Sequence, residues 1–230
     1  MQIKSRDIHC HILPGVDDGF KDPQNSLEAI RRLAQAGCRD ITFTPHLNPE
    51  QFPETDEALV RERYCEFTKL IPGELGVKTA LAAEYMVVGG FEKRVLDAPG
   101  SLLCFSDRSV LIEMSYYFRS PNLEETVMGL VINGYKPIIA HPERYLYMAD
   151  CLDDFASLRS SGCRFQLNYL SLAGYYGPAS LRIVKYLARN GWCDFFSTDL
   201  HTLPQLSNIL DKPLAAPLRY SLNSAVRHIL

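Results

Sequence analysis

Residues 7–19 of the chain read Asp-Ile-His-Cys-His-Ile-Leu-Pro-Gly-Val-Asp-Asp-Gly. Along an extended segment the side chains at positions i and i+2 share a face, so His9 and His11 point the same way and can hold one metal ion. The proline-glycine turn that follows brings Asp17 or Asp18 close, which adds a hard oxygen donor to two borderline nitrogen donors. A lone His-x-His pair is as often an ordinary half-polar strand, so the rest of the chain must decide.

Length and composition are those of one globular domain, which we expect to span residues 1–230. The hydrophobic fraction is 47%, the charged fraction is 22%, and the net charge of -3 gives no global attraction to nucleic acid or anionic membranes. We expect neither a secretory signal nor a membrane span, because no apolar run of the required length occurs. Seven scattered cysteines, never spaced Cys-x-x-Cys, favour the reducing cytoplasm over a disulfide scaffold.

A repeating unit runs through the chain: an amphipathic helix, a glycine, and a short apolar strand that ends near a polar residue. In the first copy a helix over residues 26–36 ends at Gly37, and a strand over 40–44 leads to His46. Three later copies have their glycines at Gly134, Gly162 and Gly191, their strands at 137–140, 164–167 and 194–198, and their polar residues at His141, Asn168, Asp199 and His201. Residues of catalytic type therefore recur where apolar strands end.

Two less regular strands and the opening segment bring the number of strands to seven. Strand 77–83 ends at Glu84, and strand 109–112 ends at Glu113. Short apolar strands that alternate with helices are typical of parallel βα units. The periodicity of the apolar residues does not show whether the sheet closes into a barrel. A barrel brings all seven polar strand ends to one mouth, whereas an open doubly wound sheet concentrates such residues at one switch point. We therefore expect an α/β fold, a (β/α)7 barrel with its site at the C-terminal strand ends, and a closing helix over 218–230.

Nine imidazole and carboxylate residues are expected near this mouth. They are His9, His11, Asp17, His46, Glu84, Glu113, His141, Asp199 and His201. Burying these groups together without cations is costly, so metal ions are expected to compensate their charge. Nine ligands exceed the needs of one ion and predict two or three, and a donor set without thiolate suits Mn²⁺, Fe or Zn²⁺. Closely spaced ions bind both oxygens of a phosphoryl displacement and lower the pKa of a bridging water, so that no side-chain nucleophile is needed.

Seven motifs, in order along the chain, resemble those of the polymerase and histidinol phosphatase (PHP) superfamily. They are residues 7–19, Thr44-Pro45-His46, Ala83-Glu84-Tyr85, Ile112-Glu113-Met114-Ser115, Ala140-His141-Pro142-Glu143-Arg144-Tyr145, Gln166-Leu167-Asn168 and Ser197-Thr198-Asp199-Leu200-His201. Within the superfamily, the first and fifth motifs are similar to bacterial tyrosine-protein phosphatases of the CpsB/YwqE type, which are linked to capsule and exopolysaccharide production. The resemblance implies a distorted seven-stranded (β/α) barrel with a trinuclear metal site, often of manganese.

The resemblance also implies how the ligands are shared among three ions. It gives the first ion His9, His11, Glu84 and Asp199, the second Asp17 and His46, and the third Glu84, Glu113, His141 and His201. Glu84 is then a bridge between ions. Some branches of the superfamily use histidine in place of Asp17 and Glu113, which leaves the partition among the ions open.

Two further residues are candidates for contact with the substrate. The planar guanidinium of Arg144 suits bidentate contact with phosphate oxygens, unless it pairs with Glu143 or another carboxylate. Asn168 either orients the phosphate or a metal-bound water, or is a structural amide. Four tyrosines either border an aromatic substrate or pack in the fold: Tyr116, Tyr117, Tyr175 and Tyr176.

The expected function is that of a cytoplasmic, metal-dependent protein-tyrosine phosphatase. No cysteine has an arginine six positions later, so the sequence lacks the motif of thiolate phosphatases and favours a metal-bound hydroxide as nucleophile. The resemblance implies that the substrate is a bacterial tyrosine kinase with a tyrosine-rich tail that regulates capsule or exopolysaccharide synthesis. The alternatives are a small-molecule phosphatase such as histidinol-phosphate phosphatase and a non-catalytic metal-binding docking subunit. A nuclease is disfavoured because the chain has an acidic balance and no basic groove signature.

Overall fold

The computed structural model describes residues 5–211 apart from position 99, and these form two compact units. The first unit comprises the described residues up to position 84 together with residues 196–211, and the second comprises residues 85–195. The helix expected over 218–230 lies outside the described residues. Within the described part of the chain, no helix has the length and apolar character needed to cross a membrane.

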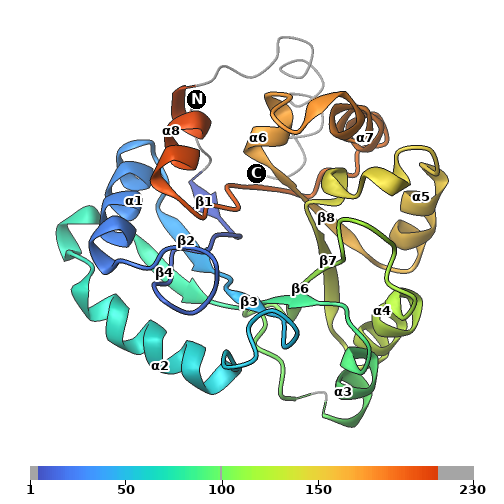
Figure 1. Cartoon of the computed structure of the whole chain (residues 1–230), viewed down its shortest axis with the longest axis horizontal. Coiled ribbons are helices and arrows are strands. Elements are labelled where there is room, and N and C mark those ends of the chain that lie inside the picture. The colour runs from blue at the N-terminus through green and yellow to red at the C-terminus, as the bar shows by residue number, and fades with distance from the viewer. Residues whose placement is uncertain (1–4, 99, 212–230) are drawn as a thin grey trace. The chain divides into compact units, whose positions relative to one another are not determined.

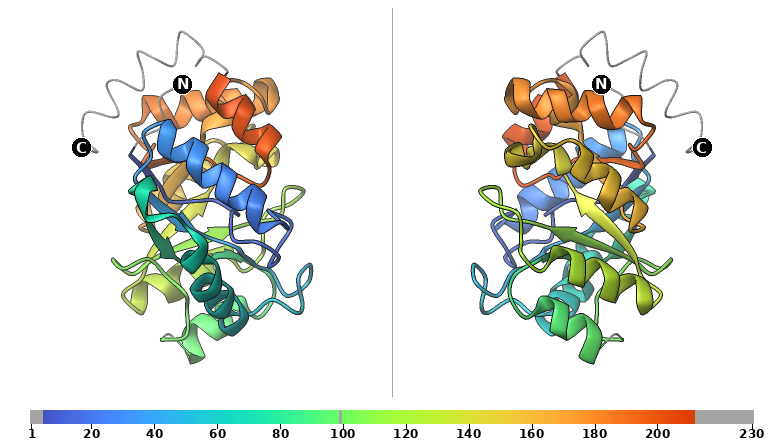
Figure 2. Two further views of the ribbon diagram at one scale, coloured as in Figure 1. Left: turned by 90° about the vertical axis from the view of Figure 1, so that its left-hand side faces the viewer. Right: turned by 90° about the vertical axis from the view of Figure 1, so that its right-hand side faces the viewer.

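The first unit is built on a parallel sheet with the strand order β1-β2-β4. Its elements are β1 (Arg6–Asp7), α1 (Pro23–Gln35), β2 (Asp40–Phe43), β3 (His46–Leu47), α2 (Glu57–Phe67), the 3₁₀ helices η1 (Thr68–Leu70) and η2 (Gly73–Leu75), β4 (Lys78–Leu81) and α8 (Leu203–Asp211). Two strands cross the boundary between the units, β5 (Glu84–Met86) and β9 (Phe195–Ser197). Helix α8 lies against α1, where Arg32 donates a hydrogen bond to the Ser207 hydroxyl over 3.1 Å (Figures 1 and 2).

The register of this sheet brings two predicted ligands to its carboxyl edge. Phe43 at the end of β2 pairs with Leu81 at the end of β4. His46 and Glu84 each follow their strand by three residues, and the Glu84 N–H donates to the Pro45 carbonyl oxygen over 3.0 Å. The two side chains therefore meet because parallel strands end together.

The opening histidine segment is extended, but only β1 is a regular strand. Beyond β1, the Ile8 N–H donates to the Ser197 hydroxyl over 3.2 Å and the Cys10 N–H to the Thr44 hydroxyl over 3.1 Å. Backbone bonds alternate with these side-chain bonds: the Thr44 N–H donates to the Cys10 carbonyl and the His11 N–H to the Leu200 carbonyl, each over 2.9 Å, and Cys10 forms an isolated bridge to Leu200. The segment that carries His9 and His11 is therefore extended as expected, although it lies beyond the regular strand β1.

The second unit contains the parallel sheet β6-β7-β8. Its elements are α3 (Phe91–Asp97), β6 (Ser109–Glu113), α4 (Leu123–Ile132), β7 (Lys136–Ala140), the 3₁₀ helices η3 (Pro142–Arg144) and η4 (Leu146–Met148), α5 (Asp153–Ser160), β8 (Arg164–Asn168), α6 (Tyr169–Leu172) and α7 (Gly177–Arg189). Ile112 pairs with Ile139, and β8 runs in the same direction on the other side of β7. Glu113, His141 and Asn168 therefore lie at the carboxyl edge of this sheet.

The predicted strands and helix ends are present, and two short strands were not predicted. The seven expected strands correspond to β1, β2, β4, β6, β7, β8 and β9, and the additional strands are β3 and β5. The glycines predicted to close helices have φ angles from 69° to 103°, and they are Gly37, Gly134, Gly162 and Gly191. Glycine adopts this left-handed backbone at little cost, so its position marks a helix end reliably.

Candidate metal centre

Four donor atoms converge in the first unit. The Nε2 atoms of His9 and His11 lie 3.2 Å apart, and they lie 3.1 and 3.2 Å, respectively, from Oε2 of Glu84. Oδ1 of Asp199 lies 3.5 Å from each of these nitrogens. Ligand atoms bound to one ion at about 2.0–2.2 Å lie about 3 to 3.5 Å from one another, so these separations fit a shared ion. The structure thus brings together four residues that the resemblance assigns to one ion.

The electrostatic environment of this cluster favours a positive charge. The side chains of His9, His11, Glu84 and Asp199 are all buried. Burial lowers the pKa of His9, but the carboxylates of Glu84 and Asp199 outweigh burial, and the net pKa is raised. The pKa of His11 is likewise raised, because Asp17 and the other carboxylates outweigh burial. Buried carboxylates require a compensating cation, and the donor set therefore fits a metal ion.

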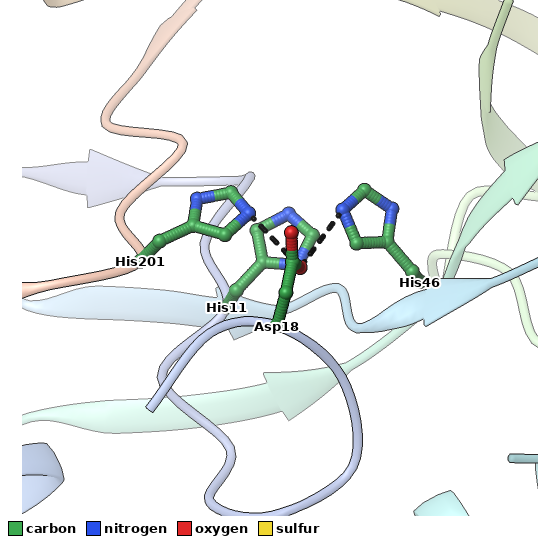
Figure 3. Close-up of side chains that lie close together, drawn as sticks. All are labelled: His11, Asp18, His46 and His201. Atoms are coloured by element: carbon green, nitrogen blue, oxygen red, sulfur yellow. Dashed lines mark ion pairs between the residues drawn. The ribbon is translucent and has the colours of Figure 1, made fainter. Parts of the chain in front are cut away.

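A second group of donors lies beside the first and contains Asp18 (Figure 3). Oδ1 of Asp18 lies 3.5 Å from Nε2 of His46 and 3.6 Å from Nε2 of His201. The ring of His11 stacks on that of His201 with the centroids 4.0 Å apart, and one ligand atom from each of these four residues lies within 4.8 Å of the others. Nδ1 of His46 also lies 3.1 Å from Oε2 of Glu84, so Glu84 contacts both groups.

Asp17, the carboxylate that the sequence predicts as a ligand, is occupied by hydrogen bonds. Its Oδ2 accepts from Nδ1 of His11 over 2.7 Å and from the backbone N–H of His46 over 3.0 Å, and its Oδ1 accepts from the N–H of Gly19 over 2.9 Å. Burial raises the pKa of Asp17, but these partners outweigh burial and lower the pKa to about 2. Asp17 therefore orients the ring of His11 in this structure, and its part as a metal ligand stays a prediction.

Two residues outside the predicted set support the segment that carries Asp199 and His201. Gln205 in the first turn of α8 accepts from the His201 N–H over 2.7 Å and donates from Nε2 to the Asp199 carbonyl over 2.8 Å. The buried carboxylate of Asp7 accepts from the N–H and hydroxyl of Thr198 over 3.0 and 2.6 Å. The contact between Asp7 and Thr198 has no local sequence signal, because it joins residues 191 positions apart. Gln205 had a local signal, because it lies four residues after His201 in a Thr-x-x-Gln helix start, where its N–H donates to the Thr202 hydroxyl over 3.3 Å.

Two of the predicted ligands have an unusual backbone conformation. Asp199 has a φ angle of 49° and His141 one of 31°, in the left-handed region that side chains other than glycine rarely adopt. Each follows shortly after a strand, β9 or β7. Backbone strain of this kind is concentrated at functional sites, where the surrounding structure must hold it in place.

Glu113 and His141 lie in the second unit. Nε2 of His141 is 3.9 Å from Oε2 of Glu113, and both side chains are buried. The structure therefore brings these two predicted ligands together, and their part in an ion shared with the residues of the first unit stays a prediction.

Asn168 belongs to a buried network of amides and carboxylates. Its Oδ1 accepts from Nε2 of Gln166 over 2.9 Å, and Oε1 of Gln166 accepts from the His141 N–H over 3.3 Å. The Asn168 N–H and the Ser171 hydroxyl donate to Oε1 of Glu143 over 2.8 and 2.5 Å. These contacts are those of a structural amide, and a role for Asn168 in orienting phosphate stays a prediction.

Arg144, the predicted phosphate ligand, is half-buried and lies against aromatic rings. Its Cζ is 4.2 Å from the centroid of the Tyr116 ring and 4.9 Å from that of Tyr176. Tyrosines that the sequence left as either substrate-bordering or packing residues thus contact the arginine.

Comparison with known proteins finds relatives that match this chain over most of their length. Tyrosine-protein phosphatase YwqE of Bacillus subtilis is 29% identical over 97% of this chain and 91% of its own length. Tyrosine-protein phosphatase CpsB of Streptococcus pneumoniae is 27% identical over 86% of this chain and 83% of its own length. Crystal structures of YwqE and CpsB present them as unique metal-dependent tyrosine phosphatases, and one such chain matches with a TM-score of 0.78 at 29% identity over 97% of this chain and 94% of its own.

A more distant likeness concerns the fold alone. The phosphotriesterase homology protein of Escherichia coli matches with a TM-score of 0.55 at 12% identity, over 97% of this chain and 93% of its own. The family model for capsular polysaccharide synthesis, CpsB/CapC, matches residues 5–215. This chain therefore belongs to the CpsB/CapC family of capsular polysaccharide synthesis proteins.

Proposed function

We propose that this chain is a metal-dependent protein-tyrosine phosphatase that hydrolyses phosphotyrosine directly with water. The observation that carries the proposal is the convergence of His9, His11, Glu84 and Asp199 at separations that fit one ion. The relatives YwqE and CpsB are named tyrosine-protein phosphatases, which supports phosphotyrosine as the substrate class.

The two donor groups support an assignment of residues to the ions. His9, His11, Glu84 and Asp199 hold one ion, and Asp18, His46 and His201 hold a second next to it, with Glu84 in reach of both. We retain Glu113 and His141 as ligands of a third ion, as the resemblance implies, move His201 from that ion to the second, and assign Asp17 to the orientation of His11. Mn²⁺ is the first candidate and Fe or Zn²⁺ the next, because imidazole and carboxylate donors suit all three metals.

The residues of this chain then have separable tasks in the reaction. When bound, the ions supply a water molecule of lowered pKa and neutralise charge on the phosphate. Asp17 fixes the ring of His11, and Gln205 fixes the turn between Asp199 and His201. The guanidinium of Arg144 donates hydrogen bonds to non-bridging oxygens of the phosphate, which stay on phosphorus when the bond to the tyrosine oxygen breaks.

The proposal extends to the fold and the cellular setting. We propose that residues 1–230 form one domain, a distorted (β/α)7 barrel whose mouth carries the ligands, in keeping with the likeness to the phosphotriesterase homology protein. The substrate is the phosphorylated tyrosine-rich tail of a bacterial kinase that regulates capsule or exopolysaccharide synthesis. All seven cysteines are free thiols, which supports a reducing compartment, the cytoplasm.

A comparison of substrates tests the function. At saturating Mn²⁺, we expect kcat/KM for a phosphotyrosine peptide to exceed that for histidinol phosphate by about 100-fold, which is about 2.7 kcal/mol of transition-state binding. The opposite preference would assign the chain to the small-molecule phosphatases. Bound metal without hydrolysis of either ester would support the docking subunit.

Asparagine variants of the two adjacent aspartates separate ligand from positioning residue. We expect Asp18→Asn to reduce the number of ions bound per chain, because it replaces a ligand. Asp17→Asn should keep the number of ions and weaken metal affinity about 10- to 100-fold, because it disturbs only the orientation of His11. Metal analysis after dialysis and a competition titration with a chelator measure both quantities. The reverse pattern would make Asp17 the ligand.

A further inference from the structure

We propose that Tyr116 and Tyr176 are positioning residues that hold the guanidinium of Arg144 in place for the phosphate of the substrate. The inference rests on the proposed function, because a phosphate monoester is the ligand that this guanidinium meets. The Cζ of Arg144 lies 4.2 Å from the ring centroid of Tyr116 and 4.9 Å from that of Tyr176. Both distances are within the range of about 6 Å over which a cation and an aromatic ring attract.

Three segments distant in sequence bring these side chains together in the second unit. Tyr116 follows the end of β6, Arg144 ends η3 after β7, and Tyr176 directly precedes α7. The backbone of Arg144 is fixed, since its N–H donates to the His141 carbonyl over 2.9 Å. Its long side chain still samples many rotamers unless neighbouring groups restrict it, and the two rings supply that restriction.

Tyr116 is itself held against the predicted ligand His141. The ring centroids of Tyr116 and His141 are 5.6 Å apart, and those of Tyr116 and Tyr145 are 6.1 Å apart. Tyr145 is fully buried, and its hydroxyl accepts a hydrogen bond from the Met114 N–H over 3.0 Å. Tyr116 therefore connects a rigid part of the core to the side chain of Arg144.

The planar shape of the guanidinium explains why the neighbouring rings matter for phosphate. The N–H donors of arginine lie in the plane of the guanidinium, and bidentate contact with phosphate also lies in that plane. A ring within cation–π distance of Cζ restricts the guanidinium through its π system, without occupying an N–H donor. The task requires the aromatic ring and not the tyrosine hydroxyl, so phenylalanine should replace tyrosine and leucine should not.

Leucine and phenylalanine variants of the metal-loaded full chain test this assignment. We expect Tyr116→Leu and Tyr176→Leu each to raise the inhibition constant of inorganic phosphate, and to lower kcat/KM, by about 5- to 30-fold. The loss should be equal for a phosphotyrosine peptide and an alkyl phosphate, and the phenylalanine variants should stay within about twofold of the unmutated chain. Phe118→Leu, which changes an exposed ring in the same loop, is the matched control and should be neutral.

A double-mutant cycle asks whether the tyrosines act through Arg144. In an Arg144→Lys background, Tyr116→Leu should cause little further loss, because the planar group that it positions is gone. Additive losses would overturn the assignment. A loss confined to the phosphotyrosine peptide would also overturn it, since the rings would then contact the leaving group.

A spectroscopic measurement separates this inference from the function on which it rests. In zinc-loaded protein, the Nε–H resonance of Arg144, identified by its disappearance in Arg144→Lys, should move when inorganic phosphate is added. In Tyr116→Leu the resonance should lose its ring-current shift and need about 5- to 30-fold more phosphate for the same displacement. If the unmutated chain hydrolyses no phosphotyrosine, the proposed function fails while this titration still decides whether the rings position Arg144. A resonance unaffected by loss of the ring would overturn the inference.

Discussion

Stripping the bound metal should abolish hydrolysis of a phosphotyrosine peptide, and added Mn²⁺ should restore it in the unmutated chain but not in His11→Ala protein. Substitution of His11 should have the largest effect on metal binding and activity, because His11 belongs to both donor groups. Its Nε2 lies 3.2 Å from Oε2 of Glu84, and its Nδ1 donates a hydrogen bond to Oδ2 of Asp17 over 2.7 Å. Its removal leaves two buried carboxylates without that partner and should lower kcat/KM by at least about 1000-fold, or about 4 kcal/mol.

The measurement has two readouts, the number of ions bound per chain and kcat/KM at a series of Mn²⁺ concentrations. His228→Ala is the matched control, since His228 is the one histidine outside the predicted ligand set. Thermal unfolding of both metal-free variants shows whether the fold is kept. Recovery of full activity by His11→Ala protein at moderate Mn²⁺ would contradict the metal centre described above.

The parts of the fold that the sequence predicted are those with local signals. Short apolar runs marked the strands, and glycines such as Gly37 marked helix ends because their left-handed backbone is a property of the residue itself. The pairing of His9 with His11 followed from the period of two along extended backbone, and it is confirmed by the 3.2 Å separation of their Nε2 atoms.

The choice between the two adjacent aspartates could not be made from the sequence, because it depends on contacts outside the motif. Nothing local distinguishes Asp17 from Asp18, because the choice depends on how the loop closes. The loop closes when the Phe20 N–H donates to the His11 carbonyl over 3.1 Å. The His46 N–H, 29 residues further along the chain, donates to Oδ2 of Asp17 over 3.0 Å. The contact of Asp7 with Thr198 is non-local in the same way, whereas Gln205 lies six residues from Asp199 and its Thr-x-x-Gln helix start could have indicated it.

Alanine at Gly19 should damage the metal centre more than any other single change in this loop that leaves every ligand in place. A Cβ atom at Gly19 would lie 2.2 Å from the carbonyl oxygen of His11, 2.6 Å from its Cβ and 2.9 Å from Oδ1 of Asp17. Backbone has to move to relieve these contacts, and the segments that move carry His11, Asp17 and Asp18. We expect the free energy of unfolding of the metal-free protein to fall by about 3 kcal/mol. Metal affinity should fall by at least about 100-fold, since misplaced ligands no longer share one ion.

Gly15 in the same loop offers the matched control, because it isolates backbone strain from steric contact. Gly15 has a φ angle of 75°, and a Cβ there would have no other atom within 4 Å. Gly15→Ala should therefore cost only the left-handed conformation, about 1 kcal/mol in urea unfolding, and leave the number and affinity of bound ions unchanged. If the two variants lose metal equally, general loosening of the loop is enough to explain both. If Gly19→Ala alone loses metal, the close approach of Gly19 to His11 is what places the aspartate pair, and the glycine that ends Asp-Asp-Gly is there for steric reasons.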